Sequence, residues 1–192
     1  FIKSQKIDFL FSLQFNKILK KEILEIPEFG SINLHYSPLP KYRGVAAPTW
    51  ALINGEKEFG VTLHYIDERV DTGDIIDQSI FNIEQVQNTR KLYDLCVQKG
   101  VSLFKDNIDS VFDLQNSKTQ QDGSQALYYP RSAIDFRQNT IDWTKDSNSL
   151  NNWIKAFIFP PFQFPEFVLD EKEYEVVAVE PDFKKRKVSE KP

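Results

Sequence analysis

The stretch INLHYSPLPKYRG, residues 32–44, combines a strand pattern with two polar side chains and a constrained turn. Its first five residues alternate between apolar and polar side chains, which is typical of a β-strand. This period of two places Asn33 and His35 on one face, about 7 Å apart along the strand. Two prolines and Gly44 then end the strand in a constrained turn. Two polar side chains near the carboxyl end of a strand indicate a site at that end.

The segments around this stretch alternate between strand and helix patterns. We expect strands at residues 8–13, 31–36, 60–66, 74–83 and 173–179, and helices at 16–26, 46–53, 88–114 and 149–157. Strands that alternate with helices build an α/β sheet with a substantial parallel part. Ligands of open α/β sheets bind beyond the carboxyl ends of the strands. The polar face of the first stretch therefore lies where a ligand is expected.

Composition divides the chain of 192 residues into four parts. Residues 1–114 carry the alternating pattern and form the predicted catalytic domain, and residues 115–148 form a polar linker. Residues 149–183 are expected to form a helix and a small β element. Residues 184–192 form a basic tail, which we expect to be disordered. The chain lacks methionine even at position 1, which favours a fragment whose beginning lies upstream.

The charge of the chain argues against a nucleic-acid partner. The net charge is −4, and the tail holds five basic residues and one acidic residue, so the remainder has 19 basic and 27 acidic residues. A body this acidic lacks the basic surface that phosphates require. The single cysteine, Cys96, excludes an intrachain disulfide and a multi-cysteine metal cluster, and no apolar run reaches the length of a membrane span. We expect a metal-free cytoplasmic protein.

An amide and an imidazole that converge at a strand end suit acyl transfer. The amide of Asn33 can donate to a developing oxyanion, and a neutral His35 can take the proton that an amine nucleophile loses. The loop Asp71-Thr72-Gly73-Asp74, which follows the next strand, supplies a carboxylate that can orient the imidazole. The alternative for His35 is a core histidine bonded to a carbonyl. His64, the other histidine, lies in the middle of a strand and is interpreted as structural.

Several spaced motifs resemble those of the N10-formyltetrahydrofolate-dependent formyltransferases. They are Asn33-x-His35-x-Ser37-Pro-Leu-Pro40-x-Tyr42-Arg43-Gly44, Trp50-Ala-x-x-Asn54-Gly55, Gly60-Val-Thr62 and Val70-Asp71-Thr72-Gly73-Asp74-Ile75. The resemblance covers about residues 8–107 and continues more loosely to about residue 179. It implies a Rossmann-like, mostly parallel sheet whose first strands and helices lie upstream of Phe1.

The resemblance also implies roles for individual residues. It places the catalytic trio on Asn33, His35 and Asp71: the first two stabilise the oxyanion, the histidine handles the proton, and the aspartate supports it. The pterin of the co-substrate N10-formyltetrahydrofolate is expected against Leu13, Phe15, Asn16, Ile18, Asp67, Val70, Thr72 and Asp74. Substrate binding is expected at Ser37, Tyr42, Arg43 and Gly44. Gln14-Phe15-Asn16 departs from the small and glycine residues that are more usual in the family.

The acceptor is expected to be a nucleotide-linked amino sugar. Family members that act on methionyl-tRNA add a basic domain of about one hundred residues, whereas only about a dozen residues follow Val179. The patterns Tyr129-Pro-Arg131, Ile141-Asp-Trp143 and Phe157-Ile-Phe-Pro-Pro161 resemble the short amino-sugar members. A methionyl-tRNA formyltransferase fragment, a formyltetrahydrofolate hydrolase and a non-catalytic binding module are the alternatives. The aromatic-proline segment, residues 157–167, either forms a homodimer surface or packs within the chain.

Overall fold

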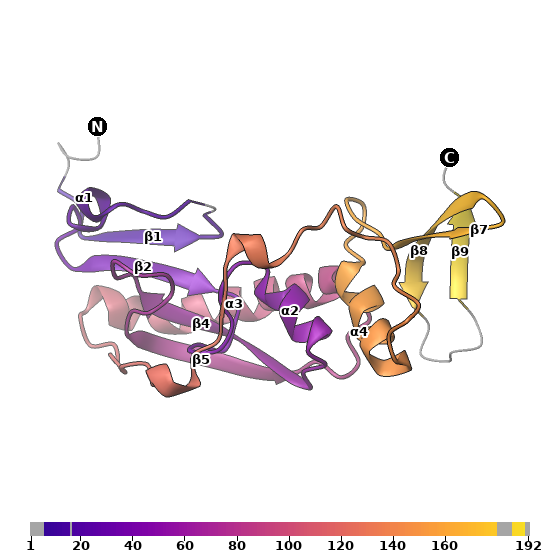
Figure 1. Ribbon diagram of the computed structural model, residues 1–192. Helices are drawn as coiled ribbons and strands as arrows, with labels where there is room; N and C mark the ends of the chain where they lie inside the picture. Colours follow the sequence, from indigo (N-terminus) through magenta and orange to yellow (C-terminus); the bar gives the residue numbers. More distant parts are fainter. Residues whose placement is uncertain (1–5, 16, 180–185, 191–192) are drawn as a thin grey trace. The chain divides into compact units, whose positions relative to one another are not determined.

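The computed structural model of the chain describes residues 6–15, 17–179 and 186–190 (Figure 1). The chain forms two compact units. The first comprises Phe1–Val45, Gly60–Phe81 and Cys96–Tyr129, and the second comprises Ala46–Phe59, Asn82–Leu95 and Pro130–Pro192. Each unit is therefore assembled from separated segments of the chain.

The central sheet has four strands in the order β1-β2-β4-β5. Its strands are β1 (Phe9–Leu13), β2 (Gly30–His35), β4 (Glu58–Tyr65) and β5 (Ile75–Asn82). The predicted α/β fold with a parallel part is confirmed, because β1 and β2 run parallel. The β2–β4 pair is antiparallel, so the sheet of this chain is mixed and not mostly parallel. Apolar patterns could not reveal this difference, because a strand shows the same pattern in either direction.

The segment between β1 and β2 contains less helix than its apolar spacing predicted. Helix α1 spans only Lys21–Leu24, in place of the expected residues 16–26. No side chain caps its first turn, and none of its residues is buried. A helix without a cap or a packed face gains too little to extend beyond one turn.

The core of the first unit lies on one face of β2 and β4. Ile32, Leu34, Val61 and Leu63 are all buried there. Helix α3 (Thr89–Phe112) runs along the sheet (Figure 1), and at Gly100 an added Cβ would lie 2.8 Å from a side-chain atom of Leu34. Since successive side chains of a strand face opposite sides, the apolar residues of β2 face α3 and its polar residues face away.

The segment that follows α3 is fastened to the first unit by short backbone pairings. Strand β6 (Tyr128–Tyr129) pairs in parallel with β3 (Arg43–Gly44), and Thr119 forms an isolated bridge with Ile75. A single-turn helix, η2 (Gly123–Gln125), lies between these two anchors, and Asp122 caps its start. The beginning of the predicted polar linker is thus tied to the turn that follows β2.

The second unit packs helices and a small sheet around its own core. Its further elements are α2 (Ala47–Ile53), η3 (Arg131–Ala133), α4 (Ser147–Phe157), β7 (Glu166–Leu169), β8 (Lys172–Val179) and β9 (Arg186–Glu190). Helix α4 begins two residues before the expected start, because the carboxylate of Asp146 accepts bonds from the N–H groups of Asn148 and Ser149. The buried core consists of Ile141, Leu150, Ile154, Ile158 and Val176.

One segment of the second unit differs from the sequence-based expectation, and another follows one of the two alternatives that the sequence left open. Residues 186–190, within the tail that we expected to be disordered, form β9 and pair with β8. This pairing covers backbone groups that an edge strand would leave open. In the aromatic-proline segment, Phe157 is 3% exposed and Phe164 packs against the core, whereas Phe162 is 80% exposed. Much of that segment therefore packs within the chain, and the homodimer surface stays a prediction.

Among the described residues, no helix combines the length and the apolar character that a membrane span requires.

Candidate active site

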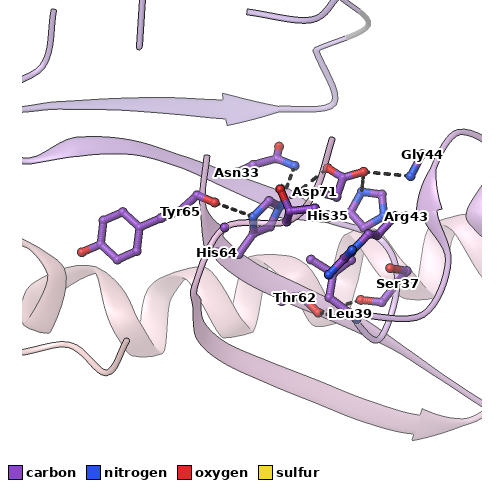
Figure 2. Close-up of polar contacts among 12 residues, drawn as sticks. Asn33, His35, Ser37, Leu39, Arg43, Gly44, Thr62, His64, Tyr65 and Asp71 are labelled. Atoms are coloured by element: carbon purple, nitrogen blue, oxygen red, sulfur yellow. Dashed lines mark hydrogen bonds and ion pairs between the residues drawn. The ribbon is translucent and has the colours of Figure 1, made fainter. Parts of the chain in front are cut away.

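Strand β2 places Asn33 and His35 at its carboxyl end, on the face opposite the core (Figure 2). Both residues are half-buried, whereas Leu34, which lies between them, and Ile32, which precedes Asn33, are buried. The loop after β4 brings the carboxylate of Asp71 to the same place. The side chain of Asp71 is 14% exposed, and that of His35 is 12% exposed. The three residues of the predicted trio therefore converge.

The imidazole of His35 has a defined tautomer. Its Nε2 lies 3.0 Å from the carbonyl oxygen of Tyr42. A carbonyl only accepts hydrogen bonds, so Nε2 carries the proton and Nδ1 keeps a lone pair. Nδ1 faces the carboxylate of Asp71, with Oδ2 at 3.8 Å. The ring can therefore take up a proton at Nδ1, beside a negative charge.

Asp71 is fixed by its backbone as well as by its side chain. Its φ is +54°, in the left-handed region that non-glycine residues rarely adopt. The N–H of Gly44 donates to Oδ2 at 2.9 Å, and Nε2 of Gln121 donates to the Asp71 carbonyl at 3.0 Å. Strained conformations persist where the surroundings determine them, and they cluster at functional sites. Here the surroundings aim the carboxylate at His35.

His64 contacts two members of the trio. It lies directly opposite Asn33 in the β2–β4 register, and its side chain is 1% exposed. Its Nε2 is 3.2 Å from Nδ2 of Asn33 and 3.8 Å from Oδ1 of Asp71. Burial and then the charge of His35 lower the pKa of His64 to about 4. The buried position agrees with the structural interpretation, but the contacts with the trio were not foreseen.

A signal for His64 was present in the sequence. In β4, Thr62 and His64 alternate with Val61 and Leu63, so they share one face, as Asn33 does with His35. The register places His64 opposite Asn33, and Thr62 opposite His35. The same period of two therefore marks a polar face on each strand. Which strand lies beside β2 is a tertiary fact that the pattern did not contain.

The turn after β2 is fastened to the sheet by side chains that sequence reasoning did not identify. Thr62 Oγ1 donates to the carbonyl of Ser37 at 2.7 Å, and Gln78 Nε2 donates to the carbonyl of Leu39 at 2.7 Å. Ser37 is completely buried, and its Oγ donates to the carbonyl of Lys41 at 2.9 Å. Ser37, expected to bind substrate, thus closes the turn in the structure.

The other residues expected at the substrate have different surroundings. Tyr42 is 1% exposed, and its ring stacks on that of Tyr129 with centroids 5.7 Å apart. It reaches the site through its carbonyl, and Gly44 does so through its N–H. Arg43 is half-buried, and its guanidinium donates to Oε1 of Gln121 at 2.6 Å. These roles in substrate binding stay predictions.

The segments expected to meet the pterin lie near the same sheet edge. Leu13 is opposite Leu34 in the parallel β1–β2 register, so the chain leaves β1 beside the end of β2. Leu13, Phe15 and Ile18 are 55%, 55% and 79% exposed, which leaves apolar surface for a planar ring. Asn16 lies outside the described residues.

The loop from residue 67 to residue 74 is ordered by its own bonds. Asp67 Oδ1 accepts from Thr72 Oγ1 and from the N–H of Arg69, and Tyr65 donates its N–H to the carbonyl of Asp74. Val70 is half-buried. Pterin contacts at these residues stay predictions. No group of three or more His, Cys, Asp or Glu residues in the described part of the chain is arranged to bind a metal ion.

Comparison with known proteins identifies a family and several relatives that the chain resembles in sequence. Residues 1–108 match the family described as formyl transferase. The methionyl-tRNA formyltransferase of Lysinibacillus sphaericus is 39% identical over 166 residues, which cover 86% of this chain and 52% of that protein. The bifunctional polymyxin resistance protein ArnA of Wigglesworthia glossinidia brevipalpis is 34% identical over 83% of this chain and 24% of its own length.

A solved structure is similar over most of the chain. It is the N-formyltransferase from Helicobacter canadensis in complex with folinic acid and dTDP-3-aminofucose, with a TM-score of 0.79 and 35% identity. The match covers 92% of this chain and 63% of that chain. The chain spans about half of the length of the methionyl-tRNA formyltransferases that it matches.

Proposed function

The chain belongs to the formyl transferase family, and from this membership we propose that it transfers the formyl group of N10-formyltetrahydrofolate to the amino group of a nucleotide-linked amino sugar. The observation that carries the proposal is the convergence of Asn33, His35 and Asp71 at the carboxyl end of β2. A hydrogen-bond donor, a proton acceptor and a half-buried carboxylate can together support acyl transfer to an amine.

The folate co-substrate supplies a formyl carbon that an amine can attack. The new bond joins that carbon to the amino nitrogen, the bond to N10 breaks, and the nitrogen of the sugar loses a proton while N10 gains one. In this chain, Nδ1 of His35 is the atom that takes the proton, because Nε2 already donates to the carbonyl of Tyr42. Asn33 donates from Nδ2 to the formyl oxygen as negative charge develops there.

Asp71 supports the proton transfer by electrostatics. When Nδ1 of His35 becomes protonated, the ring carries a positive charge 3.8 Å from Oδ2 of Asp71. Both side chains are largely buried, so solvent screens this attraction less than it would at the surface. The N–H of Gly44 keeps Oδ2 in place. The carboxylate thus stabilises the ring in its charged form.

The amino-sugar acceptor is supported by structural similarity and by charge. The related N-formyltransferase with a TM-score of 0.79 was solved with dTDP-3-aminofucose. The acidic character of residues 1–183 also disfavours a polyanion such as tRNA. Methionyl-tRNA is the second candidate, because the Lysinibacillus sphaericus enzyme for that substrate is 39% identical. The predicted cytoplasmic location and the homodimer accompany the first candidate as further predictions.

The test is release of tetrahydrofolate from N10-formyltetrahydrofolate by the chain. Parallel reactions contain a panel of nucleotide-linked amino sugars, methionyl-tRNA, or no amine. Asp71→Ala removes the supporting carboxylate, and Asp135→Ala, at a half-buried aspartate of the second unit, is the matched control. We expect turnover that requires an amino sugar, that Asp71→Ala abolishes and that Asp135→Ala preserves.

The other outcomes contradict specific parts of the proposal. Turnover with methionyl-tRNA alone would replace the sugar by the second candidate. Turnover without any amine would mean that water is the acceptor, as in a hydrolase. Absence of turnover in every arm would contradict formyl transfer by this chain.

A further inference from the structure

We propose that His64 is a positioning residue, which orients the carboxamide of Asn33 so that its nitrogen faces the formyl oxygen. The proposal rests on the formyl transfer proposed above and assigns the control of that reaction to a residue outside the trio. The sequence pattern had favoured a purely structural role for this buried histidine. The geometry around its two ring nitrogens supports a more specific one (Figure 2).

The ring of His64 is fixed in a single tautomer. Nδ1 lies 2.7 Å from the carbonyl oxygen of Tyr65, which only accepts, so Nδ1 carries the proton. Nε2 therefore has a lone pair, and its neighbour at 3.2 Å is Nδ2 of Asn33. An acceptor at that position selects the donor end of the carboxamide. His64 thus decides which end of Asn33 is oriented toward it.

This selection matters because the two ends of a carboxamide have nearly the same shape and opposite polarity. Nδ2 has two N–H groups. One donates to His64, and the second remains for another acceptor. If the group rotated by half a turn, its oxygen would face the formyl oxygen and repel the charge that develops there. A carboxamide that occupied both orientations would stabilise the transition state only part of the time.

The surroundings of His64 keep its acceptor available. The side chain is 1% exposed, and burial followed by the charge of His35 lowers its pKa, whereas Asp71, the Tyr65 carbonyl and Asp67 act in the opposite direction. The resulting pKa is about 4, so the ring is neutral near pH 7. A protonated Nε2 would present a donor to the donor end of Asn33 and would turn the carboxamide around.

A double-mutant cycle distinguishes this role from a structural one. His64→Leu removes the acceptor, and we expect kcat to fall by about tenfold or more, with KM for the folate within about twofold. In an Asn33→Ala background the same change should have little further effect on kcat, because His64 acts through Asn33. His64→Gln restores an acceptor at a similar distance from the backbone and should recover most of the activity. Circular dichroism would establish that each variant is folded.

Two kinetic outcomes would overturn the proposal. The first is a full-rate His64→Leu protein. The second is an equal fall in kcat in the presence and absence of the Asn33 side chain, since a structural defect would be independent of it.

A second measurement does not depend on turnover. The chain has only two histidines, so long-range proton–nitrogen correlation spectra contain two ring systems, which a His35→Asn variant assigns. We expect His64 to be the neutral Nδ1–H form between about pH 5.5 and about pH 8. A charged ring, or an Nε2–H form near pH 7, would overturn the proposal. If these spectra agree and no acceptor supports turnover, the failure belongs to the proposed formyl transfer and not to the orientation of Asn33.

Discussion

Acid should destabilise the folded protein through His64. The pH is lowered, and the wild type is compared with His64→Gln, which lacks the titrating ring. Burial and the charge of His35 lower the pKa of His64 from 6.5 to about 4 in the folded state. Between these two values the unfolded chain binds more protons than the folded protein. The free energy of unfolding therefore decreases as the pH falls through this interval.

The magnitude follows from the two pKa values. Protonation of the unfolded ring alone favours unfolding by about 2 kcal/mol between about pH 7.5 and about pH 5, and by roughly 3 kcal/mol once the pH has fallen below about 4. The other titrating groups are common to both proteins. The difference between the two proteins in the pH dependence of the free energy of unfolding therefore isolates residue 64. This amount is a large fraction of the stability of an ordinary domain.

Backbone hydrogen exchange in β2 and β4 is the suitable assay, because it reports on these strands directly, whereas all three tryptophans lie in the second unit. The free energy of opening, corrected for the intrinsic exchange rate, should fall by about 2 kcal/mol more in the wild type than in His64→Gln over that pH interval. A difference below about 0.5 kcal/mol would contradict this prediction, because His64 would then titrate alike in the folded and unfolded states.

Three further predictions concern other parts of the first unit. Gly44→Ala should lower the free energy of unfolding by more than about 1 kcal/mol in a urea titration. The reason is that the φ of Gly44 is +96° and that an added Cβ would lie 2.2 Å from the Tyr129 carbonyl oxygen. Gly123→Ala is the control, because Gly123 has open space around it, and this change should leave the free energy of unfolding nearly unchanged. The thiol of Cys96 should resist a disulfide reagent until urea is added, since burial raises its pKa to about 12; rapid labelling of the folded protein would contradict this. Asn33→Ala should raise the kcat barrier by about 2.7–4 kcal/mol, and a loss of kcat below about tenfold would remove it from the oxyanion role.

Local periodicity was sufficient where a single strand determines the outcome. The alternation in residues 32–36 depends on one strand that buries one face, so it located Asn33 and His35 without knowledge of the neighbouring strands. The cap at Asp146 is also local, and it starts α4 at Ser147, before the position that the apolar spacing predicts. Helix α1 shows the converse, because its apolar spacing lacked both a cap and a surface to pack against.

Features that depend on pairing between distant segments could not be predicted from the periodicity of the sequence. His64 reaches Asn33 only because β4 pairs with β2 in a particular register. Gln121, from a segment interpreted as a polar linker, donates to the carbonyls of Asp71 and Gly73, at 3.0 Å and 2.7 Å. Neither contact follows from composition or spacing. The trio could therefore be proposed from the sequence and its family resemblance, whereas the residues that contact this trio required the structure.

The most direct test of the account follows the formyl carbon itself. N10-formyltetrahydrofolate with a radiolabelled formyl group is incubated with the chain and an amino-sugar nucleotide, and the products of the wild type and His35→Ala are separated. We expect the label to appear on the amino group of the sugar with the wild type, and we expect His35→Ala to transfer none. Labelled formate in place of labelled sugar, or equal transfer by both proteins, would contradict this expectation.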